Sequence, residues 1–240
     1  MGRMGYGLEV KASQSALQAF AQGLAGHGGP PPQNSQAANL AVARVIPAEL
    51  RTKEMSDQAL YVIETAASQF TVKVFSGGLL SAFGHSPTIA IRDLAGEAGV
   101  NKDAPEESSL KVTIKASSLA VKDDLSDKDR REMERAMQQE ILETSTYPEI
   151  VYECSNISAT KAGEGQYSIG LNGDLTLHGV TRSQVVPARV ALNGDSLRAF
   201  GNFSLLQTDY DLKLASAAGG ALKVKDELKF SFNILARKKE

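Results

Sequence analysis

The stretch QYSIGLNGDLTLH, residues 166–178, alternates apolar and polar side chains along most of its length. Successive side chains of an extended strand point to opposite faces, so a period of two predicts a β-strand with one apolar face. The apolar positions are Tyr167, Ile169, Leu171, Leu175 and Leu177. His178 and Gly179 follow as a predicted turn, so we expect the strand to end there.

The same alternation recurs on both sides of this stretch. It predicts further strands over Leu60–Glu64, Gln69–Ser76, Pro87–Val100, Ser109–Val121, Glu149–Ala159, Val185–Leu192, Leu197–Gln207 and Leu222–Ala236. Short turn sequences such as Gly163-Glu164-Gly165 and Asn193-Gly194-Asp195 separate several of them. Asn-Gly between two alternating stretches predicts a hairpin with a type I′ turn, which has positive φ at both centres. Eight or nine strands joined in this way predict an antiparallel sandwich or a closed barrel, and closure would leave no edge strand exposed.

One segment, residues 126–143, departs from the alternation and reads SDKDRREMERAMQQEILE. Ser126 with Asp129 three residues later is a capping pattern, and acidic residues occupy the first turn, where the helix dipole favours them. Apolar side chains recur on one face at four-residue steps: Met133, Met137 and Ile141. The segment therefore predicts an amphipathic helix that lies on the barrel or closes one end, either as simple packing or as part of a ligand pocket.

Length and composition exclude several classes of protein. The 240 residues carry a formal charge of −2, and 42% of them are hydrophobic, as in ordinary globular proteins. A near-neutral chain lacks the general attraction for nucleic acid, and no apolar stretch approaches the roughly 20 residues of a membrane-spanning helix. The single cysteine, Cys154, excludes an internal disulfide and a cysteine-rich zinc site. The sequence also contains no phosphate-binding loop or dinucleotide fingerprint.

Residues 1–55 differ in composition from the rest of the chain. They contain Pro30-Pro31-Pro32 and neighbouring glycine and polar residues, so we predict a flexible N-terminal extension and linker over 1–55. One folded domain is predicted over 56–240. Polar residues interrupt every apolar stretch near the start, so we predict no secretory signal and a cytoplasmic location. The periplasm is the alternative if translation starts further downstream.

Two catalytic alternatives are open. Residues 194–197, Gly-Asp-Ser-Leu, spell the pattern of one class of lipases and esterases, in which the serine needs a base within reach. All three histidines, His27, His85 and His178, precede Ser196, and the pattern lies in a predicted hairpin, so we do not expect this serine to be catalytic. His85 and His178 together are a weak metal site, because a stable site needs three or four ligands.

The remaining candidate site is the apolar interior of the barrel. A barrel of about eight strands has an interior that side chains fill or that holds one small ligand. The alternation predicts an inward set of ligand-binding side chains: Phe70, Val72, Val74, Ile150, Tyr152, Tyr167, Ile169, Leu171, Leu175, Phe203, Leu205, Phe230 and Phe232. Cys154 shares this phase and is expected to be buried and inert. Candidates for orienting the polar end of a ligand are Tyr210, Arg182, His85 and His178.

The sequence resembles the YceI-like family of lipocalin-like, lipid-binding and polyisoprenoid-binding proteins. The most similar part is Tyr147–Arg182, which has the strand start Tyr147-Pro148-Glu149-Ile150 and the hairpin sequence GDLTLHGVTR over residues 173–182. Weaker similarity is found at Phe70–Val74, Gly84-His85-Ser86, Phe200–Phe203, Thr208-Asp209-Tyr210 and Val224–Leu235. The resemblance covers residues 60–240.

This resemblance implies an eight-stranded antiparallel barrel with one helix against it. It also implies a hydrophobic channel that binds, stores or transports an isoprenoid quinone, a polyisoprenoid or a fatty acyl lipid, without catalysis. The expected partner is this apolar ligand, with no nucleic acid, no metal and no other cofactor, and a homodimer is left open. The alternatives are a hydrolase that uses Ser196 or the His85 and His178 pair, and a ligand-free interaction scaffold.

Overall fold

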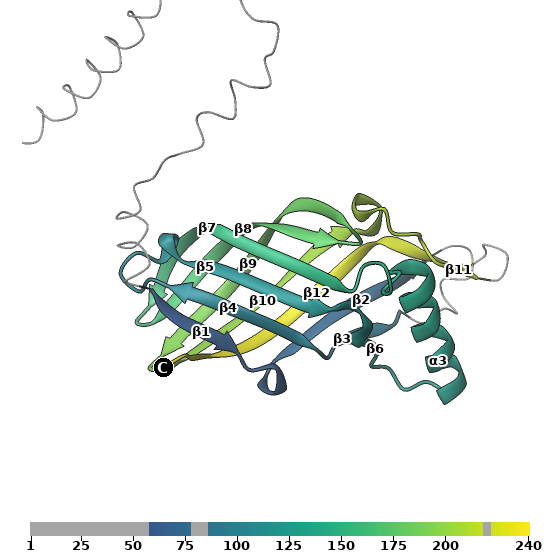
Figure 1. Ribbon diagram of the computed structural model, residues 1–240, viewed down its shortest axis with the longest axis horizontal. Helices are drawn as coiled ribbons and strands as arrows, with labels where there is room; N and C mark the ends of the chain where they lie inside the picture. The colour runs from purple at the N-terminus through teal and green to yellow at the C-terminus, as the bar shows by residue number, and fades with distance from the viewer. Residues whose placement is uncertain (1–57, 78–85, 218–221) are drawn as a thin grey trace, which may run out of the picture. The chain divides into compact units, whose positions relative to one another are not determined.

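The computed structural model describes residues 58–77, 86–217 and 222–240 (Figure 1). The predicted extension over 1–55, with His27, and the candidate residue His85 lie outside these residues. The described residues form twelve strands: β1 (Ala59–Ile63), β2 (Gln69–Gly77), β3 (Thr88–Ile91), β4 (Leu94–Val100), β5 (Ser109–Lys115), β6 (Leu119–Val121), β7 (Glu149–Gly163), β8 (Gln166–Leu177), β9 (Val180–Asn193), β10 (Ser196–Leu206), β11 (Ser216–Ala217) and β12 (Leu222–Lys238).

Eight of these strands form a closed ring in which every neighbouring pair is antiparallel. The order around the ring is β1-β4-β5-β7-β8-β9-β10-β12, and β12 pairs with β1 to close it. The strands β2, β3 and β6 continue β1, β4 and β5 toward one end, with β12 paired to β2, β2 to β3 and β3 to β6. The predicted eight-stranded antiparallel barrel is therefore confirmed.

Three neighbouring strands of the barrel are interrupted side by side, where the sequence predicted two continuous strands. The predicted strand Pro87–Val100 is broken at Arg92-Asp93, and Ser109–Val121 is broken by the 3₁₀ turn η3 (Ala116–Ser118). The break between β1 and β2 holds a second such turn, η1 (Thr65–Ala67). The inward phase shifts by one residue from Ile91 to Leu94, both of which are buried. These strands bend around the barrel, and the bend requires a local interruption of the ladder.

Side-chain hydrogen bonds join the three breaks to one another. Thr65 Oγ1 donates to the carbonyl of Leu94 at 2.6 Å. Ser118 Oγ accepts from the amide of Asp93 at 3.1 Å. Two backbone groups at the break between β3 and β4 are thus satisfied by hydroxyl groups from the two neighbouring breaks.

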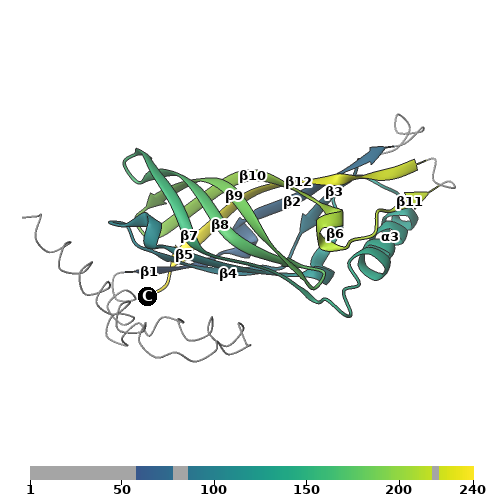
Figure 2. The same cartoon turned by 90° about the horizontal axis from the view of Figure 1, so that it is seen from above.

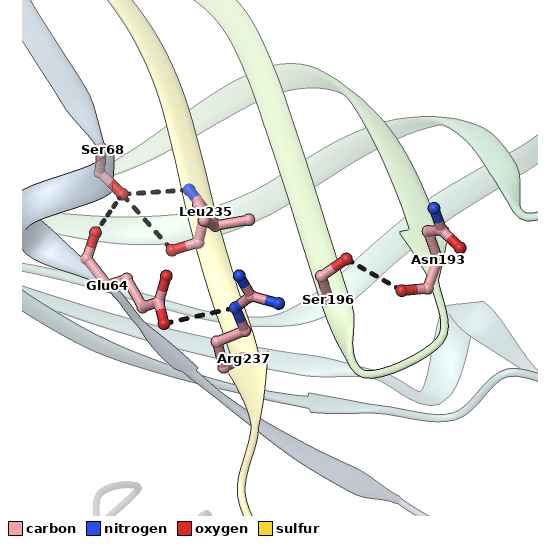
Figure 3. Close-up of polar contacts among 6 residues, drawn as sticks. All are labelled: Glu64, Ser68, Asn193, Ser196, Leu235 and Arg237. Carbon is pink, nitrogen blue, oxygen red and sulfur yellow. Dashed lines mark hydrogen bonds and ion pairs between the residues drawn. The ribbon is translucent and has the colours of Figure 1, made fainter.

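Ser68, in the break between β1 and β2, holds the last strand in place where the barrel closes (Figure 3). Its hydroxyl accepts a hydrogen bond from Leu235 N at 3.0 Å and donates to the carbonyl of Glu64 at 2.8 Å. The Glu64 carboxylate also forms an exposed ion pair with Arg237, with 3.3 Å between Oε1 and Nε. These contacts link β12 to the start of the chain's folded part.

The predicted helix starts at the expected residue and lies at one end of the barrel (Figure 2). Ser126 Oγ accepts from Asp129 N at 3.2 Å and caps α3 (Asp127–Ala136). The α-helix ends before Glu143, the predicted end, and continues as the π-helix η4 (Met137–Ile141), with Leu142 N donating to Met137 O at 2.9 Å. No helix among the described residues is long and apolar enough to cross a membrane.

Polar side chains of α3 and η4 cover the free edge of β6. Arg130 donates to the carbonyl of Val121 at 2.5 Å, and Glu134 accepts from the amide of Val121 at 2.9 Å. Gln138 Nε2 donates to Ser117 O at 3.3 Å, just before β6. The three side chains stand at four-residue steps, so they project from one face of the helix. They take the place of the missing neighbouring strand, which protects an edge that would otherwise pair with another chain.

The tight turns between the long strands differ in type. His178 and Gly179 join β8 to β9 with φ of 52° and 74°, the pattern of a type I′ turn. The prediction of a type I′ turn at Asn193-Gly194 is wrong, because Asn193 pairs with Ser196 and belongs to β9. The turn centres are therefore Gly194 and Asp195, of which only Gly194 has a positive φ, 57°, as in a type II′ turn.

Candidate functional site

An apolar cavity runs through the inside of the barrel. Its volume is about 290 Å³, close to the lower end of the range for small-molecule sites, roughly 300 to 1,000 Å³. Side chains from every strand of the closed ring line it, and nearly all of them are aliphatic or aromatic. Such an interior is suited to an apolar ligand, because burial of apolar surface is the main interaction that it offers.

The thirteen side chains that the sequence predicted to point inward all line this cavity. From the first half of the chain these are Phe70, Val72 and Val74 of β2, and Ile150 and Tyr152 of β7. The others are Tyr167, Ile169, Leu171, Leu175, Phe203, Leu205, Phe230 and Phe232. Their orientation agrees with the period of two, whereas their contact with a ligand stays a prediction.

Four phenylalanine rings form a continuous cluster on one wall of the cavity. They come from three neighbouring strands: Phe70 from β2, Phe203 from β10, and Phe230 and Phe232 from β12. Phe203 and Phe230 are stacked, with 4.6 Å between ring centroids, and Phe70 meets the ring of Phe232 edge-on at 6.0 Å. The cluster gives this wall a broad aromatic surface for an apolar chain to contact.

The two ends of the cavity differ in polarity. Met137 and Ile141 of η4, with Leu142, line the end that α3 covers. Asn101, Lys102 and Ser108 line the other end, in the turn between β4 and β5 that contains η2 (Pro105–Glu107). Among the described lining residues, Lys102 is the only charged one, and its side chain is exposed. The cavity thus has a mostly apolar end under the helix and a polar end at the β4–β5 turn.

Hydrogen bonds within the turn fix the polar end. Asn101 is buried, and its Oδ1 accepts from the amides of Asp103 and Ala104 at 3.0 Å each. Its Nδ2 donates to Glu107 Oε2 at 2.9 Å. Side-chain bonds of this kind to nearby amides stabilise a turn without a regular ladder. The turn is therefore ordered by its own polar groups and does not depend on a ligand.

Tyr152 is a half-buried residue of the cavity wall that carries a polar group. Its hydroxyl lies 2.9 Å from the carbonyl of Leu171 and 3.0 Å from that of Gln184. The ring lies against Gly173, where a Cβ atom would stand 2.8 Å from Tyr152 Cζ. Burial raises the pKa of Tyr152, so the phenol stays neutral and remains a hydrogen-bond donor. Gly173 therefore leaves the space that lets the ring cross β8.

The described candidates for orienting a polar ligand group do not line the cavity. Tyr210 is only 2% exposed and belongs to the hydrophobic core, and burial raises its pKa. Arg182 Nε donates to the carbonyl of Asp209 at 3.1 Å, outside the barrel wall. His178 packs on Tyr147 with 4.4 Å between ring centroids, and its Nε2 lies 4.0 Å from Glu143 Oε2. Arg182 and His178 thus have their partners at the turns, and Tyr210 packs in the core, so none of the three lines the cavity. A role for them in orienting a ligand stays a prediction.

Gln184 and Gln207 are polar lining residues that sequence reasoning missed. Both stand in phase with inward apolar residues: Gln184 is two positions before Val186, and Gln207 is two positions after Leu205. The alternation therefore predicts inward positions for both glutamines, but only apolar residues were selected from the inward positions.

The contacts of Ser196 and Cys154 are those of residues that stabilise the fold. Ser196 Oγ donates to Asn193 O at 2.9 Å across the β9–β10 turn (Figure 3). His178 lies at the opposite end of β9, and a strand of 14 residues spans about 40 Å, so His178 cannot act as its base. Cys154 is 4% exposed, as expected for a core residue, and burial raises its pKa. Its neighbours on the core side include Ile157 and Leu171.

A closed antiparallel barrel with an apolar cavity and one capping helix places the protein in the lipocalin-like class of β-barrels. The sequence matches the YceI-like domain over residues 61–236, so the chain belongs to that family. None of the curated proteins matches the sequence.

Two solved structures show the same fold. One is BcnA from Burkholderia cenocepacia, at 19% identity and a TM-score of 0.55, with 72% of this chain and 98% of that chain covered. The other is a polyisoprenoid binding domain from Saccharophagus degradans, implicated in plant cell wall breakdown. It has 14% identity and a TM-score of 0.55, and the match covers 76% of this chain and 99% of that chain.

Proposed function

We propose that this protein binds one long apolar ligand inside the barrel and stores or transports it without catalysis. The ligand classes that we propose are an isoprenoid quinone, a polyisoprenoid or a fatty acyl lipid. The observation that carries the proposal is the continuous apolar cavity, which reaches from the Lys102 end to Leu142 under the helix. Membership of the YceI-like family and the fold shared with a polyisoprenoid binding domain support it.

Burial of the ligand supplies the binding free energy in this proposal. Each buried CH₂ group contributes about 0.8 kcal/mol, so ten such groups contribute about 8 kcal/mol before the costs of association. Few specific hydrogen bonds are needed for tight binding. Discrimination among apolar ligands then depends on chain length and shape, which the cluster of Phe70, Phe203, Phe230 and Phe232 would sense.

The distribution of charge favours a neutral ligand over an ionised one. Lys102 is the only charged residue among the described lining residues, and it lies at one end. A carboxylate placed deeper would have no counter-charge, and an isolated buried carboxylate is strongly unfavourable. An isoprenoid quinone or alcohol can be accepted along the whole cavity, whereas a fatty acid requires its head group at Lys102.

Native mass spectrometry of the purified protein, followed by organic extraction, tests the proposal. One isoprenoid or acyl species at about one per chain is the expected result. Retinol, a neutral isoprenoid whose fluorescence rises in apolar surroundings, provides a binding assay for protein that is purified empty. Palmitate at neutral pH is the matched anionic probe, and we expect it to bind more weakly than retinol.

A protein that arrives empty, and stays empty with retinol, geranylgeraniol, a short-chain ubiquinone and palmitate, would overturn the proposal. That outcome would favour the packed interaction scaffold. A cytoplasmic location and the boundaries of the extension over 1–55 stay predictions, and cell fractionation with antibodies against the barrel tests the first of them.

A further inference from the structure

The strands β9 and β10 are paired over only part of their length. Their ladder runs from Ser196↔Asn193 to Phe200↔Arg189 and stops there. On their other sides both strands stay paired throughout, β9 with β8 as far as Val180 and β10 with β12 as far as Leu206. The stretches Val180–Ala188 and Gly201–Leu206 therefore face one another without a ladder. We name this pair of facing stretches the seam.

Local sequence explains why the ladder stops. Pro187 has no N–H group and cannot donate to a neighbouring strand. At the same point Gly201 approaches β9 so closely that a Cβ atom would meet the carbonyl of Pro187 and the ring of Phe232. The two strands thus approach closely at Pro187 and Gly201 and form no ladder beyond them.

Few polar contacts bridge the seam. The β9–β10 ladder has no residue pair in the seam, and the bond from Arg182 Nε to Asp209 O, 3.1 Å, joins the strands only at the far end. The free edge of β6 is different, because Arg130, Glu134 and Gln138 cover it. The seam is therefore the side of the barrel that opens with the smallest loss of hydrogen bonds.

The borders of the seam carry most of the exposed large hydrophobic side chains. Four large hydrophobic side chains are exposed among the described residues, and three of them belong to its borders: Val185 is 54% exposed, Phe200 45% and Leu206 43%. The fourth, Leu214, lies in the segment after η5 (Gln207–Tyr210). The alternation along β9 and β10 places polar residues at the other outward positions, such as Arg189, Asn202 and Ser204.

The inside of the seam is the cavity itself. Val186 and Ala188 of β9, and Phe203 and Leu205 of β10, line the cavity directly behind the exposed residues. Gln184 and Gln207 add two carboxamide groups to the same part of the wall. Separation of β9 from β10 would therefore connect the exposed apolar side chains to the cavity without passage through either end of the barrel.

We propose that the seam is the lateral portal through which the apolar ligand enters and leaves the cavity. The inference rests on the proposed function and adds the route of exchange to it. Val185, Phe200 and Leu206 contact the ligand chain during passage, and the Arg182–Asp209 contact limits how far the strands separate. Passage at the side offers the chain apolar side chains both outside and inside the wall, whereas the end opening is lined by Asn101, Lys102 and Ser108.

A cross-link across the seam tests the portal. Extension of the register beyond Phe200↔Arg189 places Val185 opposite Ser204, and both are exposed. The double variant Val185→Cys, Ser204→Cys is joined by a short bis-maleimide, and the link is verified by mass spectrometry. The matched control, Ser204→Cys, Lys229→Cys, shares one cysteine but joins the paired strands β10 and β12, where Ser204 stands opposite Lys229.

The readout is the rate of retinol uptake and release in stopped-flow fluorescence, with the equilibrium affinity measured separately. We expect the seam link to slow both rates by roughly tenfold or more at unchanged affinity, and the control link to leave both rates unchanged. Arg182→Ala, which removes the contact at the end of the seam, is expected to accelerate both rates. This variant provides a second test if the linked protein does not fold.

The outcomes separate the two proposals. Retinol binding with equal rates in the linked, control and unlinked proteins, or with no acceleration in Arg182→Ala, would overturn the portal and leave the proposed function intact. Failure of the unlinked wild-type protein to bind any of the apolar probes would overturn the proposed function and the portal together.

Discussion

Phe203 and Phe230 stand directly opposite one another on β10 and β12, and their rings stack inside the cavity with an interplanar angle of 8°. The pair joins two strands that are neighbours in the barrel although 27 positions separate the residues in sequence. Phe70 from β2 meets both rings edge-on, at 6.4 Å and 6.2 Å between centroids. This wall is therefore both a part of the core and a part of the cavity lining.

Replacement of Phe203 by Asp is expected to abolish uptake of retinol. The change puts a carboxylate without a counter-charge into the apolar cavity, and only the protonated form would be tolerated there. Fluorescence titration measures binding, and circular dichroism verifies the fold. Ser204→Asp, one position along on the exposed face, is the control and should bind normally. Phe203→Leu should keep binding, and a folded Phe203→Asp protein with normal binding would contradict the inward assignment.

Replacement of Ser68 by Ala is expected to destabilise the barrel by about 1–3 kcal/mol, because it leaves the amide of Leu235 without its partner. Urea unfolding at neutral pH measures the change. Ser231→Ala provides the comparison, since Ser231 lies exposed on β12, the strand that contains Leu235. This substitution should change the free energy of unfolding by about 0.5 kcal/mol or less. Equal effects of the two substitutions would argue against the role of Ser68 at the closure.

Replacement of Glu134 by Ala is expected to expose the edge of β6. The amide of Val121 loses its acceptor, which costs about 1–3 kcal/mol, and the freed edge promotes association. Glu134→Gln keeps an acceptor oxygen and should restore most of the stability. Glu132→Ala, on an exposed position of the same helix, is the control. Urea unfolding and light scattering measure the two effects, and a Glu134→Ala protein that equals the control in both would contradict the covering role of the helix.

Asp226 is expected to stabilise the protein at neutral pH but not in acid. Hydrogen bonds from the side chain and the backbone of Thr208 lower the pKa of Asp226 below its ordinary value. A lowered folded-state pKa contributes stability above the unfolded-state value of about 4, and this contribution is lost as the pH falls through the folded-state pKa. Asp226→Asn should therefore have a lower urea midpoint than wild type at pH 7, and the difference should shrink in acid. A difference that is constant with pH would show that ionisation of Asp226 is not involved.

Cys154 is expected to react slowly with iodoacetamide in the folded protein. It is 4% exposed, and burial raises its pKa, so both access and the thiolate fraction are low. Alkylation in urea, followed by mass spectrometry, gives the reference rate for the open chain, and we expect it to be at least roughly tenfold faster. Comparable rates in the two states would show that this part of the core opens readily.

The sequence was sufficient to predict which apolar side chains of the strands point into the barrel. Alternation alone predicted that Tyr167, Leu171 and Phe230 point inward, because in a strand the face of each residue follows from its position along the chain. The helix start at Ser126 and the turn at His178-Gly179 were predictable for the same reason, since capping and turn preferences act over a few residues.

Predictions about the site were less complete. Tyr210, Arg182 and His178 were chosen for their chemistry, but residues from distant segments, such as Asp209 for Arg182, determine where these side chains point. Gln184 and Gln207 were missed although their phase was inward. The breaks near Asp93 and at η3 were missed because an interrupted strand keeps apolar residues on both sides of the break.

The sequence by itself therefore determined the family, most of the strands and the face on which most apolar side chains lie, because these depend on local patterns. Only the tertiary structure decided which strands became neighbours: that β12 closes the barrel on β1, that helix side chains replace a strand beside β6, and that β9 and β10 part beyond Phe200. Hydrogen-bond partners across a barrel come from residues far apart in the chain, and no local pattern specifies them.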